Sequence, residues 1–161
     1  LENLRYFSTL AGVAECTDTE MRHTLIRAGL PDGAIDRRVG TYSKGMRQKV
    51  GIAMAIARRV QLLLLDEPTS ALDVYHQHAV LHEIKSFSQK GNLVLSVMHD
   101  LNLASLYADQ VIVLGNNCIQ HVDSPESVFR EDILERTYRT PVHVSSHPSF
   151  LKPMIFTEPR H

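Results

Sequence analysis

Four consecutive leucines, Leu62 to Leu65, stop abruptly at the acidic pair Asp66 and Glu67, and this junction constrains the fold of the 161-residue chain strongly. A short apolar run that ends on polar residues is typical of a β-strand buried on both faces, so 61–65 is predicted to be such a strand. Strands of this kind occur in parallel sheets covered by helices. The two acids would then lie at the carboxyl end of the strand, where such sheets bind ligands.

The rest of the chain alternates between helical and strand patterns. Helices are predicted at 1–11, 19–29, 44–57 (capped by Ser43), 74–89 and 101–108, and strands at 93–98, 110–114 and 118–122. Asn116-Asn117 predicts a hairpin between the last two strands, and Ser124-Pro125 opens a further helix. Beyond Tyr138 we expect a short strand and a mobile tail. This alternation predicts an α/β fold built on a parallel sheet.

Composition excludes several classes of function. Seventeen basic and eighteen acidic residues give a net charge of −1, so no broad positive field exists to attract nucleic acid. The two cysteines, Cys16 and Cys118, have no zinc or redox spacing, and the nine histidines are not spaced like metal ligands. No stretch approaches the roughly 20 apolar residues needed to span a bilayer.

The leucine run continues as Leu-Leu-Leu-Leu-Asp-Glu-Pro-Thr-Ser-Ala-Leu-Asp over residues 62–73, which resembles the ATP-binding-cassette (ABC) transporter ATPases almost letter for letter. The resemblance implies a P-loop NTPase (RecA-like) fold with a helical subdomain, and it implies ATP and Mg²⁺ as ligands. In this family Asp66 would hold the Mg²⁺ that bridges the β- and γ-phosphates. Glu67 would orient or deprotonate the attacking water.

Upstream of this run, Tyr42-Ser43-Lys44-Gly45-Met46 resembles a degenerate copy of the family's signature segment, Leu-Ser-Gly-Gly-Gln. Ser43 and Gly45 are retained, whereas Lys44 and Met46 replace glycine and glutamine. A hydroxyl and bare N–H groups at a helix N-terminus form an anion site. The resemblance implies that Ser43, Lys44 and Gly45 contact the γ-phosphate of ATP held by the opposite subunit.

Three further residues acquire roles from the same resemblance. His99, which follows the strand predicted at 93–98, is similar to the switch histidine that contacts the γ-phosphate. Asp73 would belong to the loop that couples the two ATP sites of a dimer, and Ser70 would help to seat Glu67. Catalysis is therefore assigned to Glu67 and His99.

Two family elements are not found in the sequence: the phosphate loop Gly-x-x-x-x-Gly-Lys-Ser/Thr and the glutamine loop. We therefore expect a fragment that is inactive by itself, divided into a helical subdomain with the signature segment (1–57), half of the parallel-sheet core (58–122) and a C-terminal helix, strand and tail (123–161). Its expected partners are a second ATPase subunit in a head-to-tail dimer and integral membrane permease subunits. Its expected location is the cytoplasmic face of the cell membrane, as a peripheral protein.

The two halves of the chain favour different cargoes. The front half, with Tyr42-Ser43-Lys44-Gly45-Met46, is similar to exporters of drugs or polysaccharides. The back half, with His99-Asp100-Leu101-Asn102-Leu103-Ala104 and the segment 138–147, is similar to importers of iron-siderophore, haem or cobalamin. The back-half match is longer and less generic, which favours import of a metal chelate. An exporter ATPase and a truncated, non-catalytic cassette that acts as a binding or regulatory partner remain as alternatives.

Overall fold

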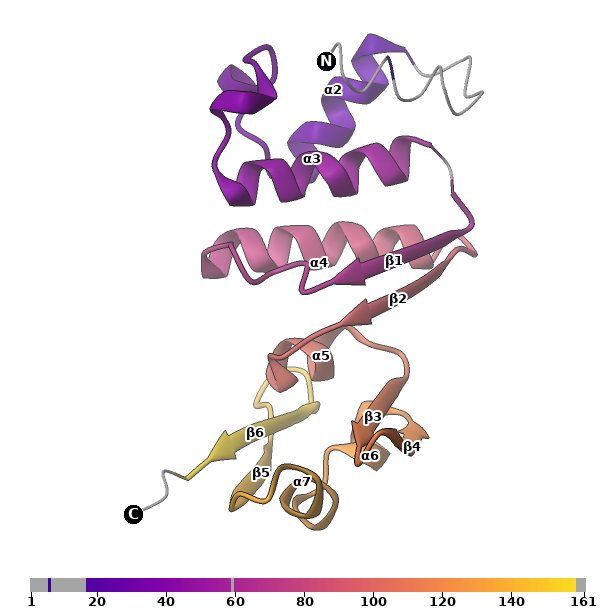
Figure 1. The fold of residues 1–161 in the computed structure, drawn as a ribbon, viewed down its shortest axis with the longest axis vertical. Helices are drawn as coiled ribbons and strands as arrows, with labels where there is room; N and C mark the ends of the chain where they lie inside the picture. Colours follow the sequence, from indigo (N-terminus) through magenta and orange to yellow (C-terminus); the bar gives the residue numbers. More distant parts are fainter. Residues whose placement is uncertain (1–5, 7–16, 59, 159–161) are drawn as a thin grey trace. The chain divides into compact units, whose positions relative to one another are not determined.

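The computed structural model describes residues 6, 17–58 and 60–158, which belong to two compact units, Leu1–Val97 and Met98–His161 (Figure 1). The helix predicted at 1–11 lies outside the described residues except for Tyr6. The three-part division predicted from the sequence stays a prediction. The α/β character is confirmed, because helices and strands occur in both units.

Among residues 17–58 and 60–97, the first unit contains three α-helices, each with a polar cap at its start. They are α2 (Asp18–Arg27), α3 (Lys44–Ala57) and α4 (Val74–Ser88), and two short 3-10 helices, η1 (Asp32–Ala34) and η2 (Val39–Thr41), connect α2 to α3. Thr17 and Glu20 form a capping box on α2. The Ser43 hydroxyl oxygen accepts a hydrogen bond from the Met46 N–H at 3.2 Å, so the bounds and the cap predicted for α3 are confirmed.

The hydrophobic core of the first unit joins α2, the 3-10 segment and α3. Its buried members are Met21, Leu25, Ala28, Leu30, Ala34, Ile35, Tyr42, Val50, Ala53 and Ala57. The Tyr42 hydroxyl donates to the carbonyl oxygen of Ala34 at 2.6 Å, which satisfies its polar atom inside this core. The packing places the start of α3, immediately after Tyr42, at a defined position in the unit.

A parallel pair of strands completes the first unit. In it, β1 (Leu62–Asp66) pairs with β2 (Leu93–Val97), in a register that sets Leu62 opposite Leu93 and Asp66 opposite Val97. Parallel pairing is confirmed, but the prediction of a strand buried on both faces is wrong. Leu64 is 64% exposed and Leu95 opposite it is 50% exposed.

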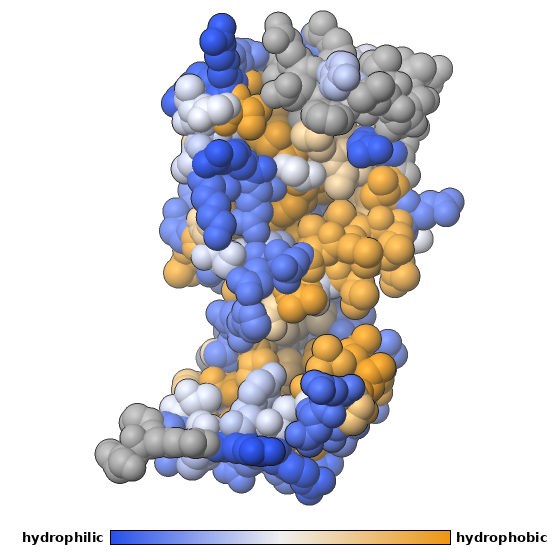
Figure 2. All heavy atoms as spheres, viewed as in Figure 1, coloured by the Kyte–Doolittle hydropathy of each residue, from blue (hydrophilic) through white to orange (hydrophobic). Residues whose placement is uncertain are grey.

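The reason is geometric, because successive side chains of a strand point to opposite faces of its sheet. Helix α4 packs against β2, and Leu63 is buried. Leu62, Leu64, Leu93, Leu95 and Val97 share the other face and are between 49% and 65% exposed. Figure 2 shows hydrophobic (orange) surface in the region where Figure 1 labels β1 and β2.

The second unit consists of two antiparallel hairpins and three short helices: α5 (Leu101–Tyr107), β3 (Val111–Gly115), β4 (Cys118–Asp123), α6 (Pro125–Val128), α7 (Glu131–Tyr138), β5 (Val142–Ser146) and β6 (Pro153–Thr157). The hairpin at Asn116-Asn117 is confirmed, and both residues have positive φ (50° and 59°), as a type I′ turn requires. Among the described strands β3 pairs only with β4, so it does not extend the parallel sheet.

The segment 142–157 is more ordered than the sequence predicts. The expectation of a short strand and a mobile tail is wrong for 142–157, where β5 and β6 form a hairpin. Their inward residues Val142 and Ile155 join a core with Val113, Val128, Phe129 and Leu134. The Asn102 side chain of α5 also bonds β6 twice, to the N–H of Ile155 at 2.7 Å and to its carbonyl oxygen at 3.1 Å.

Candidate functional site

The predicted acids lie where the parallel pair ends. Asp66 is the last residue of β1 and is exposed, and Glu67 follows it with a left-handed backbone, φ 45°. The Glu67 N–H donates to the carbonyl oxygen of Val97 at 3.0 Å. Its own carbonyl oxygen accepts from the Ser70 hydroxyl at 3.2 Å, which is the contact expected if Ser70 seats Glu67. We call residues 66–70 the acidic turn.

The start of α3 carries the degenerate signature segment. Ser43 and Lys44 are exposed, and Gly45 is buried against the loop after the acidic turn. A Cβ at Gly45 would lie 2.8 Å from the carbonyl oxygen of Ala71 and 2.9 Å from Leu72 Cδ2. Only glycine permits this approach. The first N–H groups of a helix lack intrahelical acceptors, so the exposed end of α3 has donors suited to an anion.

Asp73 is exposed and is the N-cap of α4. Its carboxylate accepts from the His76 N–H at 3.0 Å and pairs with His76 Nδ1 at 2.8 Å. These hydrogen bonds lower the pKa of Asp73, and the Lys49 ammonium lowers it further. Lys49 is buried (4% exposed) and donates to the carbonyl oxygen of Gly29 at 2.9 Å. Burial lowers the pKa of Lys49, whereas the charge of Asp73 acts in the opposite direction.

Because Asp73 caps α4 with a lowered pKa, we predict a pH-dependent contribution to stability. The prediction concerns the complete gene product that contains this sequence, which we call the full-length protein. A carboxyl whose pKa is lowered by folding stabilises the folded state above its unfolded pKa of about 3.9 and loses that effect as the pH falls through its folded pKa. We expect Asp73→Ala to lower the melting temperature at pH 7 and the difference to shrink below about pH 4. Asp73→Asn, which retains an N-cap oxygen without a charge, should show a smaller, less pH-dependent decrease. A pH-independent decrease for Asp73→Ala would contradict the prediction.

In the first unit the start of α3 lies close to the acidic turn and to the loop that follows it. Gly45 packs against Ala71 and Leu72 of that loop, and Gln48 Nε2 donates a hydrogen bond to the carbonyl oxygen of Glu67 at 2.8 Å. The sequence analysis missed Gln48 and Lys49. Their signal was present, because Gly45, Gln48, Lys49 and Ile52 follow helical spacing and polar residues interrupt an apolar face. His99 is exposed and belongs to the second unit, two residues after the end of β2.

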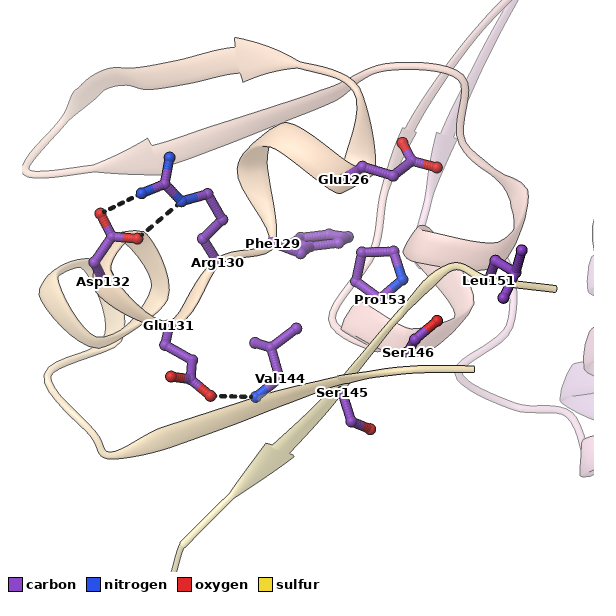
Figure 3. Close-up of a pocket in the computed structure, with 10 residues that line it drawn as sticks. All are labelled: Glu126, Phe129, Arg130, Glu131, Asp132, Val144, Ser145, Ser146, Leu151 and Pro153. Atoms are coloured by element: carbon purple, nitrogen blue, oxygen red, sulfur yellow. Dashed lines mark hydrogen bonds and ion pairs between the residues drawn. The ribbon is translucent and has the colours of Figure 1, made fainter. Parts of the chain in front are cut away.

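The second unit contains an open hollow of about 800 Å³ between α6, α7 and the β5–β6 hairpin (Figure 3). Its charged side chains already have partners: Arg130 pairs with Asp132, and Glu131 accepts from the Val144 N–H at 2.8 Å. Lys152 pairs with Glu126 and lowers the pKa of that carboxyl. Its lining residues include three acids and one cation, Arg130, which is already paired, so this hollow is unsuited to a polyphosphate. None of the predicted site residues lines it.

The acidic turn is chemically suited to Mg²⁺, because this ion prefers oxygen ligands and is commonly bound by one or two carboxylates together with substrate phosphates. Asp66 offers an exposed carboxylate at a strand end. Within the described residues, no group of three or more His, Cys, Asp or Glu side chains could hold a metal ion by itself. The exposed carboxylate of Asp66 is thus chemically suited to a magnesium–phosphate complex.

Acids after a parallel strand, beside a helix start adapted to an anion, are the arrangement of a nucleotide-binding fold of the α/β class. Residues 2–70 match the family model described as ABC transporter. A protein of Idiomarina loihiensis named hemin import ATP-binding protein HmuV is 81% identical over 132 residues, which are 78% of this chain and 51% of the relative. The chain belongs to the ABC transporter ATPase family, and it spans about half the length of this relative.

Solved structures agree with this fold. A protein assigned as a metal-chelate-type ABC transporter, in an inward-facing conformation, superposes with a TM-score of 0.72 at 23% identity, over 91% of this chain and 60% of that one. A dimeric ATP-binding cassette with bound ADP and phosphate gives 0.58 at 27% identity, over 65% of this chain and 46% of that one. Within the part of the chain that the structure describes, no helix is long and apolar enough to cross a membrane.

Proposed function

We propose that the full-length protein hydrolyses ATP to drive the import of haem or a related iron chelate. The observation that carries the ATPase assignment is the acidic turn, in which an anchored Glu67 directly follows Asp66 at the end of a parallel strand. The cargo assignment is supported by the relative at 81% identity, whose name includes hemin import. An exporter ATPase, which the front half favoured, is the less supported alternative.

Each residue of the site has a proposed role. Asp66 would hold Mg²⁺, which would supply positive charge to offset that of the ATP phosphates. Glu67 orients the attacking water and accepts its proton, while His99 stabilises negative charge on the γ-phosphate. Ser43, Lys44 and Gly45 bind the γ-phosphate of ATP on a second copy of the protein, and Asp73 belongs to the loop that couples the two sites.

The proposed assembly is a head-to-tail ATPase dimer beneath integral membrane permease subunits, at the cytoplasmic face of the membrane. A structural neighbour is a dimeric cassette, which supports the dimer. The exposed N-terminus of α3 also supports it, because Ser43 and Lys44 remain accessible to a ligand held by a partner. The permease is expected because import requires a route through the membrane.

The cargo is tested in proteoliposomes that contain the full-length protein and its permease. The ATPase faces the lumen and haem is added outside. Haem should then raise ATP turnover and accumulate in the lumen as ATP is hydrolysed. Drug-type or polysaccharide cargo that raises turnover instead would favour the exporter. A full-length protein with no Mg-ATP turnover, alone or with its permease, would favour a non-catalytic, regulatory cassette and contradict the proposal.

If Ser43 contacts ATP that is bound to the second copy, two heterodimers should differ in activity. With Ser43→Arg in one copy and Glu67→Gln in the other, both lesions fall in the same composite site, so about half of the turnover should remain if the sites act independently. With both substitutions in one copy, each site is damaged once and turnover should be nearly lost. Differently tagged copies, purified as heterodimers, allow the comparison. The reverse order of activities would show that Ser43 acts on its own subunit's ATP.

A further inference from the structure

Glu67 has a backbone conformation that its sequence disfavours. Its φ of 45° lies in the left-handed region, which side chains other than glycine rarely adopt. Pro68 follows it, and the ring of a proline restricts the backbone of the preceding residue further, toward extended conformations. Neighbouring groups must therefore maintain this conformation, which determines where the carboxylate of Glu67 points.

The main chain of Glu67 is held by several hydrogen bonds. Val97 accepts from its N–H, and the N–H and the hydroxyl of Ser70 both donate to its carbonyl oxygen at 3.2 Å. The Ser70 contacts are local, within the same turn. The shortest bond to that carbonyl oxygen, at 2.8 Å, comes from Gln48 Nε2 on α3, 19 residues away in the sequence.

Gln48 is specialised for this bond. Only the amide nitrogen can donate to a carbonyl oxygen, so the contact determines the orientation of the side-chain amide. The other amide atom, Oε1, is buried and accepts no hydrogen bond from any described residue. Burying an unsatisfied acceptor is unfavourable, yet the chain has an amide here rather than an apolar side chain of similar size. The bond to Glu67 is the feature that an apolar residue would lack.

We propose that Gln48 is a positioning residue, which holds the main chain of Glu67 in its left-handed turn and thereby orients the catalytic carboxylate. This inference rests on the proposed ATPase function. It also links two parts of the site, because Gln48 and Ser43 belong to the same end of α3. A shift of α3 on binding the partner's ATP would be transmitted through Gln48 to the glutamate of the same chain.

The test compares Gln48→Met with wild type in the full-length protein by steady-state ATP turnover. Methionine preserves length and volume and removes the donor. We expect kcat to fall by about 10- to 100-fold, as for a misplaced catalytic group, with KM for ATP within about twofold of wild type. Gln48→Glu, which also lacks the donor, should show at least the same loss. A kcat like that of wild type for Gln48→Met overturns the proposal.

Gln77→Met is the matched control, because Gln77 Nε2 donates to the carbonyl oxygen of Thr69, in the same turn, at 3.3 Å. It should retain most of the turnover. An equal loss in this control would mean that any loosening of the turn is damaging, and it would overturn a specific role for Gln48. Melting temperatures of the variants confirm that each one is folded in the assay.

A double variant that combines Gln48→Met with Glu67→Gln distinguishes a positioning role of Gln48 from a general structural role. If Gln48 acts through the carboxylate of Glu67, the residual single-turnover hydrolysis of Glu67→Gln should not fall further. A full additional loss in the double variant overturns the proposal. Absence of wild-type turnover, or retention of turnover in Glu67→Gln, would instead refute the proposed function.

Discussion

Glu67→Gln is expected to reduce ATP turnover by the full-length protein by at least about 100-fold, the usual contribution of a positioned general base. Glutamine has nearly the same shape as glutamate, but its amide is a poor proton acceptor and carries no charge. The main-chain bonds to Val97, Ser70 and Gln48 do not involve the side chain, so the acidic turn should keep its conformation. ATP binding should therefore be retained, and the variant should accumulate in the ATP-bound form.

The measurement pairs phosphate release with equilibrium binding of Mg-ATP. Glu158→Gln makes the same chemical change at an exposed residue after β6, and it should leave both quantities unchanged. Turnover close to wild type in Glu67→Gln would show that another residue orients the water. Loss of ATP binding together with turnover would show that Glu67 contributes to nucleotide affinity rather than to the chemical step.

Local sequence patterns predicted most of the secondary structure. The bounds of α3 and its cap at Ser43 follow from helical spacing and an N-cap residue, and the Asn116-Asn117 hairpin follows from turn chemistry. The family resemblance then assigned roles to Asp66, Glu67, Ser43 and Gly45, and these roles stay predictions. Each of these signals depends on residues close together in the sequence.

Features that depend on distant contacts could not be predicted in this way. The leucines of β1 resemble a doubly buried strand, but burial also needs a partner on each face, and composition does not report how many partners a given chain supplies. The β5–β6 hairpin was missed because Pro, Ser and His around 145–153 resemble a loop, whereas its order comes from packing of Val142 and Ile155 into the core. The polar interruption at Gln48 was visible in the helical pattern, but its role was missed because its partner is a main-chain atom, which no residue type identifies.

The second large effect is expected at Gly45, where two glycines of one helix allow a matched comparison. A Cβ at Gly45 would lie 2.8 Å from the carbonyl oxygen of Ala71, a main-chain atom that cannot move aside without displacing the loop before Asp73. A Cβ at Gly51, also on α3, would meet nothing within 4 Å. Gly45→Ala should therefore destabilise the full-length protein by roughly 1–3 kcal/mol, as other overpacked sites do. Gly51→Ala should stabilise it by about 0.5–1 kcal/mol, since alanine is the better helix former.

The two substitutions should also separate in activity. Relief of the clash at Gly45 must move the first turn of α3 away from residues 71–72, and this movement carries Ser43 and the amide of Gln48 with it. Gly45→Ala should then lose ATP turnover at temperatures where it is still folded, whereas Gly51→Ala should retain it. Urea unfolding and phosphate release, measured on both variants at one temperature, provide the comparison. Equal stability and equal turnover in the two variants would show that the loop after the acidic turn can move at little energetic cost. Close packing of α3 at Gly45 would then not be required to maintain the site.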